Sequence, residues 1–206
     1  SIEIEQVNTE ALGQLQLEGV KVFPQPEIIR LIQDKGLQKQ FLLTHGIPTA
    51  PFTLFDSTDS IVSMVQTGMI KFPFVQKLRK GGYDGKGVEI IRSFEDFPKL
   101  MEGPSLVEEM ADIVKEISII TVRNEHGEIR NYPAVEMLFH PSANLVEYLL
   151  CPAEIPEQVL VHANRLALEL TEQLSIVGLL AIEMFVLKDG HIWINEMAPR
   201  PHNSGH

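Results

Sequence analysis

The sequence has only one cysteine, Cys151, in 206 residues. A single cysteine cannot form an internal disulfide or supply a multi-thiolate metal site, so neither feature can hold this fold together. Apolar runs are also short, and none approaches the roughly 20 residues that a membrane-spanning helix needs. The opening residues SIEIEQVNTE lack the basic flank and apolar stretch of a signal peptide. We therefore expect a cytoplasmic protein with no membrane partner.

Positive charge is scarce as well. Lys and Arg total 17 against 28 Asp and Glu, which gives a formal net charge of -11. Because phosphate backbones are held by surplus Lys and Arg, this balance argues against a nucleic-acid binder. A phosphate ligand would have to meet local cations or a metal. The 44% apolar and 22% charged residues are typical of a globular chain with ample core, which excludes fibrous and disordered classes.

The ends of the chain look like parts of a longer protein. The sequence begins with Ser1 and passes directly into the strand-like IEIEQV, and it ends on APRPHNSGH with no helix or strand pattern after it. Between them, residues 1–70 read as a short helix after Asn8, a buried strand over 20–23, helices across 26–45, a strand at 52–55 and a helix from about 57 to 68.

The pattern of predicted secondary structure changes near residue 70. Residues 71–111 predict a compact α+β unit: a strand, a glycine-rich loop, a strand, a helix over 93–101 and a strand. Residues 112–206 predict antiparallel strands, one long helix opened by Pro156, and two last strands joined by Lys188-Asp189-Gly190, a strong hairpin signal.

The glycine-rich loop RKGGYDGKG, residues 79–87, is the first candidate for chemistry. Glycines let the backbone approach an anion and turn its N–H groups inward, while Lys80 and Lys86 add charge, so the loop could close over phosphates. The alternative is an ordinary hairpin turn.

The acids of the last hairpin are the second candidate. Strand alternation places Glu183 in phase with Ala181 and Phe185, and Glu196 in phase with Ile192 and Ile194, so we expect both acids on apolar faces. Paired carboxylates there suit Mg²⁺ that bridges to phosphates, and Asn195 could add an oxygen. A salt bridge to a basic residue, or a register that leaves one Glu in solvent, would explain them equally well.

The closing segment 200–206 is the third candidate. Arg200 suits a bidentate grip on phosphate or bicarbonate, and His202, Asn203 and Ser204 add polar groups. An ordinary loop is the alternative; a zinc site built on His202 and His206 is weaker, because no third ligand of suitable spacing follows. Lys77 on a probable central strand also suggests an anion partner, though a salt bridge is the simpler reading.

Together these pieces resemble the ATP-grasp superfamily, and within it the N5-carboxyaminoimidazole ribonucleotide synthase family. The resemblance spans nearly the whole chain and rests on QDKGLQKQFLLTHGIPTAPF, KLRKGGYDGKGVEII, LVEEMADIVKEISIITVR, and AIEMFV followed by INEMAPRPHNSGH. It implies an α+β fold with two subdomains that clasp ATP. Residues 1–70 would be the end of a Rossmann-like domain with linking helices, 71–111 the small lid subdomain, and 112–206 an incomplete large subdomain.

The resemblance also implies ATP and Mg²⁺ as cofactors and assigns residues to them. Lys35 and Lys77 would meet the phosphates; where relatives commonly have Arg, Lys35 keeps the charge but not a bidentate fork. The lid would be Gly82, Tyr83, Asp84, Gly85, Lys86, Gly87 and Val88. Adenine would lie along Glu108, Glu109, Met110 and Ala111, and the ribose near Glu116. Glu183 and Glu196 would hold Mg²⁺ beside Asn195. Bicarbonate and 5-aminoimidazole ribonucleotide would meet Tyr83, Arg200, His202, Asn203 and Ser204.

The implied activity is an ATP-dependent carboxylation in purine biosynthesis. ATP would phosphorylate bicarbonate to carboxyphosphate. The amine of 5-aminoimidazole ribonucleotide would then attack that carbonyl, or CO₂ released from it in the pocket, and phosphate would leave. Two alternatives stay open: another ATP-grasp ligase that activates a carboxylate, which only the APRPHNSGH segment disfavours, and a nucleotide-binding module without turnover. The expected partners are these small molecules, and a homodimer is compatible with the resemblance.

Overall fold

The computed structural model describes residues 2–82, 86–140 and 145–205. Three helices begin the chain: α1 (Thr9–Leu17), α2 (Pro26–Ile32) and α3 (Lys35–Thr44). Asn8 caps α1 by accepting the backbone N–H groups of Glu10 and Ala11, both at 3.0 Å. Pro26 occupies the first turn of α2, where its missing N–H costs nothing. These helices confirm the sequence expectation for 8–17 and 26–45.

The two strands expected before α2 are wrong. Residues 2–7 and 20–23 form no strand in the described part of the chain. In the first stretch, the Gln33 amide donates to the carbonyl oxygens of Glu5 and Val7, at 2.6 and 2.9 Å. A side chain thus satisfies backbone groups that the sequence pattern assigned to a sheet.

A small antiparallel sheet follows, in the order β1-β4-β2-β3. Its strands are β1 (Phe52–Phe55), β2 (Phe74–Leu78), β3 (Val88–Ile91) and β4 (Ser105–Glu109). Helix α4 (Thr58–Gln66), capped by Ser57, contributes Ile61 and Val65 to the apolar cluster on one face of this sheet.

The helix expected over 93–101 is instead a short 3-10 helix, η1 (Phe94–Lys99), with Pro98 inside it. Proline lacks the N–H that a longer α-helix would need at this position, and its ring clashes with the preceding turn. The small sheet also includes β1, because Phe52 pairs with Glu108 and Phe55 with Ser105. The sheet therefore reaches back beyond residue 70, and the division into three domains at residues 70 and 111 stays a proposal.

The large sheet is antiparallel throughout and runs in the order β10-β9-β5-β7-β8, with β6 also paired to β5. Its strands are β5 (Ile113–Arg123), β6 (Ile129–Asn131), β7 (Val135–Phe139), β8 (Val146–Leu150), β9 (Gly178–Leu187) and β10 (Ile192–Ala198). Helix α5 (Glu157–Leu174) precedes β9, and a turn of 3-10 helix, η2 (Asn203–Gly205), follows β10. The antiparallel arrangement expected for this half is confirmed.

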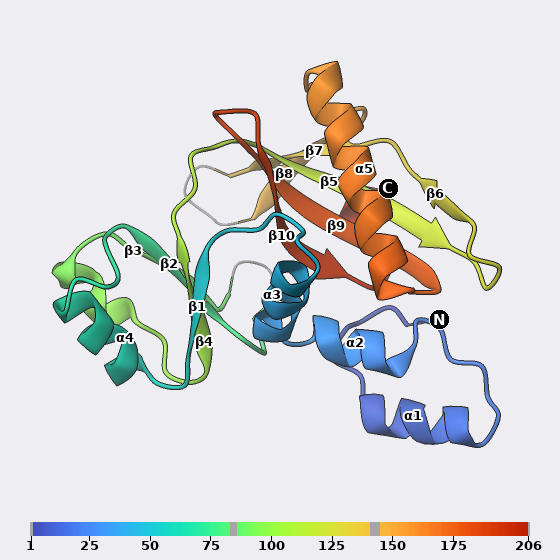
Figure 1. Ribbon diagram of the computed structural model, residues 1–206, viewed down its shortest axis with the longest axis horizontal. Coiled ribbons are helices and arrows are strands. Elements are labelled where there is room, and N and C mark those ends of the chain that lie inside the picture. The colour runs from blue at the N-terminus through green and yellow to red at the C-terminus, as the bar shows by residue number, and fades with distance from the viewer. Residues whose placement is uncertain (1, 83–85, 141–144, 206) are drawn as a thin grey trace.

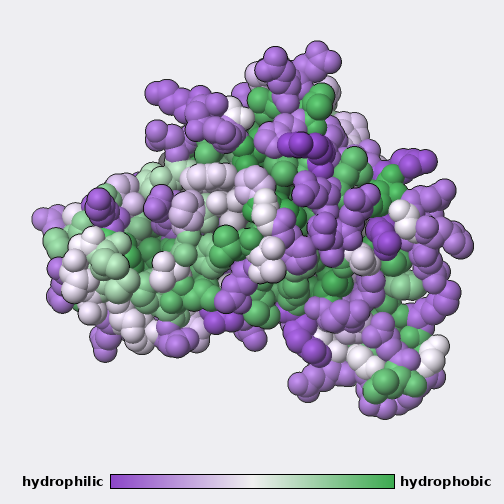
Figure 2. Space-filling view, in the orientation of Figure 1, coloured by the Kyte–Doolittle hydropathy of each residue, from purple (hydrophilic) through white to green (hydrophobic). Residues whose placement is uncertain are grey.

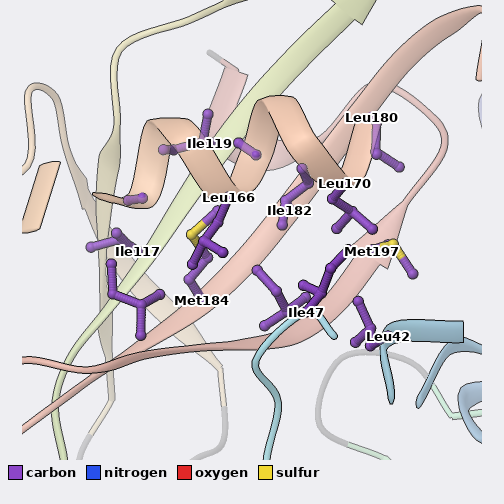
Figure 3. Packing of buried hydrophobic residues seen from close by; sticks show 14 of the residues in the cluster. Leu42, Ile47, Ile117, Ile119, Leu166, Leu170, Leu180, Ile182, Met184 and Met197 are labelled. Atoms are coloured by element: carbon purple, nitrogen blue, oxygen red, sulfur yellow. The ribbon is translucent and has the colours of Figure 1, made fainter. Parts of the chain in front are cut away.

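One face of the large sheet carries the main apolar cluster, and the other carries a smaller apolar cluster beside polar residues. Helix α5 lays Leu166 and Leu170 against Ile182 and Met184 of β9, as Figure 3 shows. Alternation sends the neighbouring residues of β9, Glu183 included, to the opposite face. The polar residues considered below therefore lie on the face that α5 leaves uncovered.

The chain crosses between the two sheets twice, and the crossings touch. After α3, Pro48 accepts the backbone N–H of Ile194 in β10 at 2.8 Å, and the chain then enters β1. At the end of β4, the Glu109 N–H donates to the carbonyl of Pro51 at 3.1 Å before the chain enters β5. Figure 1 shows the small sheet with α4 as one lobe, the large sheet with α5 as the other, and α3 between them.

Hydrophilic residues cover much of the surface over α5 and the first helices, whereas the surface over the small sheet mixes pale and apolar residues (Figure 2). Among the described residues, no helix combines the length and apolar character needed to cross a bilayer.

Candidate functional site

A β-bulge in β10 places the two acids of the last hairpin together. Ile194 pairs with Met184 and Glu196 pairs with Glu183, so Asn195 is an extra residue between them. The expectation that Glu196 is in phase with Ile192 and Ile194 is therefore wrong, because the bulge reverses the alternation after Ile194. Both acids lie on the uncovered face, directly opposite one another.

The N-terminus of α3 brings a lysine to this acid pair. The Lys35 ammonium forms an ion pair with Glu196. Asp34 caps the helix by accepting the Gly36 and Leu37 N–H groups, and its carboxylate also holds Arg79 through two hydrogen bonds of 2.8 Å. Burial alone would raise the pKa of Asp34, but these hydrogen bonds outweigh it and lower the pKa.

A second cation comes from the small sheet. Lys77 Nζ lies 2.7 Å from Glu108 Oε2 on the neighbouring strand and donates to Asn195 Oδ1 at 2.8 Å. Its ammonium also lies 5.9 Å from the centre of the Phe185 ring. Lys77 thus connects the small sheet to the bulge of the large sheet. Lys39, which the sequence reasoning did not select, lies on the other side of Glu108 with Nζ 2.7 Å from Oε1.

Glu116 of β5 joins the uncovered face, since it pairs with Phe185 of β9. Burial and the nearby charge of Glu183 raise the pKa of Glu116 to about 7, while Lys77 partly opposes the rise. This carboxyl group is thus close to half protonated at neutral pH.

The closing segment folds back onto the same face. His202 Nε2 lies 3.2 Å from Glu183 Oε1, and His202 Nδ1 lies 2.8 Å from the Ser204 hydroxyl. Ser204 is buried and donates to the hydroxyl of Ser118 on β5 at 2.9 Å. The segment is therefore fixed to the sheet by a chain of polar contacts.

Arg200 does not contact the acid pair directly. Its Nε donates to Glu5 Oε1 at 3.0 Å, across 195 residues of sequence. Burial raises the pKa of Glu5, which Arg200 opposes and the nearby charge of Glu196 reinforces. The strand-like opening of the chain, whose sequence gave no sign of chemistry, is thereby brought to the edge of the site.

The remaining candidates lie around this group. Gly82 lies beside α3, because a Cβ on it would lie 3.8 Å from Lys35 Cε and 2.7 Å from the Lys86 carbonyl oxygen. Gly87 has φ +80°, and Val88 begins β3. Tyr83, Asp84 and Gly85 lie outside the described residues. Glu109 and Met110 are exposed, Ala111 is half-buried and Asn203 is exposed.

The sequence missed Lys39, Glu5, Ser118 and the Asp34–Arg79 pair. One signal was available for Lys39: it stands four residues after Lys35, so the two side chains share a helix face. No local signal exists for Glu5 or for the serine contact, because their partners are 195 and 86 residues away.

The donor set at the bulge fits a hard divalent cation. Glu183 and Glu196 provide carboxylate oxygens from directly paired positions, and Asn195 provides an amide oxygen between them. At present His202 lies against Glu183, and Lys35 forms an ion pair with Glu196. In the described ranges, no cluster of three or more His, Cys, Asp or Glu side chains could hold a metal. A cation here would therefore need further oxygens from a ligand, as phosphates supply.

Comparisons with known proteins identify the family of the chain. The ATP-grasp domain family matches residues 40–206. Phosphoribosylaminoimidazole carboxylase of Saccharomyces cerevisiae is 37% identical over 213 residues, an alignment that takes in 100% of this chain and 37% of the yeast protein.

Solved structures match over nearly the whole chain. N5-carboxyaminoimidazole ribonucleotide synthetase from Thermotoga maritima is 40% identical with a TM-score of 0.85, and covers 99% of this chain and 52% of that one. N5-carboxyaminoimidazole synthase from Aspergillus clavatus, in complex with ADP and 5-aminoimidazole ribonucleotide, is 29% identical with a TM-score of 0.86. The match covers 97% of this chain and 52% of that one.

The chain spans about half the length of these solved relatives and less of the yeast protein. The family match covers most of the chain, and the α+β fold with its two sheets is shared throughout. The expectation from the sequence motifs is confirmed: the chain belongs to the ATP-grasp family.

Proposed function

We propose that the protein carries out the ATP-dependent carboxylation of 5-aminoimidazole ribonucleotide with bicarbonate, through carboxyphosphate, in purine biosynthesis. One observation carries the proposal. Two lysines from different elements, Lys35 and Lys77, meet the bulge that holds Glu183 and Glu196, with His202 at its side. Cations and paired acids at one point suit a nucleotide polyphosphate together with a divalent metal.

The residues of the chain would divide the phosphoryl transfer as follows. The ammonium groups of Lys35 and Lys77 would bind phosphate oxygens and orient the γ-phosphoryl group toward bicarbonate. Glu183, Glu196 and Asn195 would hold Mg²⁺, which supplies charge neutralisation on the phosphates when bound. Because phosphoryl transfer depends mainly on positioning and electrostatics, these contacts account for most of what the protein must do.

The rest of the nucleotide would lie along the second crossing between the sheets. Backbone groups of Glu109, Met110 and Ala111 would meet the adenine, and Glu116 the ribose hydroxyls. The loop from Gly82 to Val88, which includes Tyr83, Asp84, Gly85, Lys86 and Gly87, would close over the phosphates and keep water from the carboxyphosphate. The Glu108 side chain lies between Lys39 and Lys77, which favours a role toward the lysines over one toward adenine.

The closing segment, residues 200–206, would bind bicarbonate and 5-aminoimidazole ribonucleotide. Arg200 is suited to bicarbonate or to a phosphate of the ribonucleotide, and Tyr83, Asn203 and Ser204 would add hydrogen bonds. His202 would orient the substrates between Glu183 and Ser204. This segment separates the carboxylase from other ligases that activate a carboxylate with the same nucleotide site.

Release of inorganic phosphate from Mg-ATP tests the proposal. We expect release that depends on both bicarbonate and 5-aminoimidazole ribonucleotide, with one ribonucleotide carboxylated for each ATP. Release that needs another carboxylate substrate would favour a different ligase. ATP binding without release under any of these conditions would favour a nucleotide-binding module.

Two further proposals concern the setting of the enzyme. Cys151 is free and exposed, which suits a reducing compartment such as the cytoplasm.

Strand β8 forms one edge of the large sheet and exposes Tyr148 and Leu150, so a second copy of the chain could cover it in a homodimer. Sedimentation of the wild type and of Tyr148→Lys tests the homodimer, since a charged edge should keep the chain monomeric.

A further inference from the structure

A buried carboxylate is shared by two lysines beside the candidate phosphate site. Glu108 is 2% exposed, and its two oxygens each lie 2.7 Å from an ammonium nitrogen, Oε1 from Lys39 and Oε2 from Lys77. Lys39 is 3% exposed and also donates to the Thr49 hydroxyl and, at 3.4 Å, to the carbonyl of Ile194. Lys39 is thus enclosed by protein, while Lys77 extends from Glu108 to the bulge.

The charges in this group do not cancel. Two ammonium groups face one carboxylate, and the other partner of Lys77, Asn195, is neutral. Burial alone would raise the pKa of Glu108, but the two lysines outweigh it and lower the pKa. Burial lowers the pKa of Lys39 to about 8, so Lys39 is still mostly protonated at neutral pH. The group therefore carries surplus positive charge in a buried place. Lys77 contacts the side chain of Asn195 in the bulge, whereas Lys39 contacts the bulge only through the backbone carbonyl of Ile194.

We infer that Lys39 is a positioning residue for polyphosphate binding. It forms an ion pair with one oxygen of Glu108, so that the other oxygen fixes Lys77 in place without neutralising its charge. The inference deepens the proposed function and rests on it. Without Lys39, Glu108 would have Lys77 as its only ionic partner, and a one-to-one buried pair would leave little charge for a ligand phosphate. In this role Lys39 acts through Glu108 and, enclosed by protein, touches no ligand.

Three variants separate this role from a purely structural one: Lys39→Met, Glu108→Gln and the double variant. Affinities for ATP and for adenosine are measured by displacement of a fluorescent ATP analogue. We expect Lys39→Met to weaken ATP by about tenfold or more and to leave adenosine unchanged, since only the phosphates meet Lys77. Lys39→Met with Glu108→Gln removes one charge of each sign and leaves the Lys77 ammonium, which is then no longer neutralised, so ATP affinity should return to within about threefold of the wild type.

A matched control is available on the large sheet. Lys115 pairs with Glu136 at 2.7 Å, on the face that α5 covers, and Lys115→Met should change neither affinity. Circular dichroism and thermal unfolding establish that each variant is folded. If Lys39→Met does not fold, the double variant decides, because it removes one charge of each sign from the buried group and keeps the group's net charge: loss of its ATP affinity overturns the inference.

The remaining outcomes are equally decisive. Unchanged ATP affinity in Lys39→Met, or equal loss of ATP and adenosine, overturns the positioning role while the wild type still binds ATP. Failure of the wild type itself to bind ATP contradicts the proposed function instead. Weaker ATP, unchanged adenosine and recovery in the double variant would together support the inference.

Discussion

Glu183 and Glu196 face each other across β9 and β10 because Asn195 is an extra residue in one strand only. Without that bulge, Glu196 would point with Ile194 into the core under α5, where an unpaired carboxylate is costly. The bulge therefore does two things at once: it builds the acid pair and directs the Asn195 amide toward Lys77.

The acid pair predicts that Glu196→Gln removes the Mg²⁺-dependent part of ATP affinity and of turnover. The substitution keeps the shape of the side chain but replaces a hard anionic ligand with a neutral one. Calorimetric titration of ATP with Mg²⁺ or with EDTA measures this, and Glu183→Gln should behave alike. Glu169→Gln, on the exposed surface of α5, is the control. Near wild-type turnover of both site variants at limiting Mg²⁺ would show that the metal assignment is wrong.

Lys86 and Arg200 should affect different ligands. Lys86→Ala is expected to weaken ATP about tenfold and spare the ribonucleotide. Arg200→Ala should spare ATP and weaken bicarbonate and the ribonucleotide, and it also frees Glu5. Titration of each ligand into each variant tests this division. Equal loss of ATP affinity in the two variants would contradict it.

Glu116 predicts an unusual pH dependence of stability in the metal-free protein. Its folded pKa is about 7, above the ordinary value of 4.5, so the folded state binds more protons than the unfolded state between these values. Stability contributed by this group is full below pH 4.5 and is lost as the pH rises toward 7, by up to about 3 kcal/mol.

The variant Glu116→Gln should remove that loss, so its stability advantage over the wild type grows as the pH rises from 4.5 to 7. Urea unfolding in EDTA at several pH values measures the difference. An advantage that stays constant over this range would mean that Glu116 titrates normally.

Asp34 predicts a large effect on stability. Asp34→Ala removes the cap of α3 and leaves Arg79 without its bidentate partner, at an expected cost of about 2–4 kcal/mol. Asp34→Asn keeps a capping oxygen but loses the charge, so its cost should be smaller. Chemical denaturation measures both, and equal costs would assign the whole effect to the ion pair.

Local pattern was sufficient for much of the fold. The spacing of Ala163, Leu166, Ala167 and Leu170 predicted α5, and Asp189-Gly190 predicted the turn between the last two strands. The acid pair was found as well, although the reasoning for Glu196 was wrong, since no residue type signals a bulge in advance.

Features that depend on distant partners could not be predicted in this way. Lys39 looks like a helix surface residue until β4 brings Glu108 against it. The Glu5–Arg200 pair joins the two ends of the chain, and the small sheet recruits β1 from before the expected boundary. Each of these depends on tertiary packing, which sequence spacing does not encode.

The two crossings between the sheets are the points about which we expect the halves to move. They lie side by side, joined by the Glu109–Pro51 hydrogen bond, while Pro48 stays attached to Ile194 of the large sheet. Two adjacent tethers permit rotation about one line and resist sliding. The small sheet would then rotate toward and away from the large sheet. The hydrogen bond from Lys77 to Asn195 would break in the open arrangement and form in the closed one, when both sheets bind the same ligand.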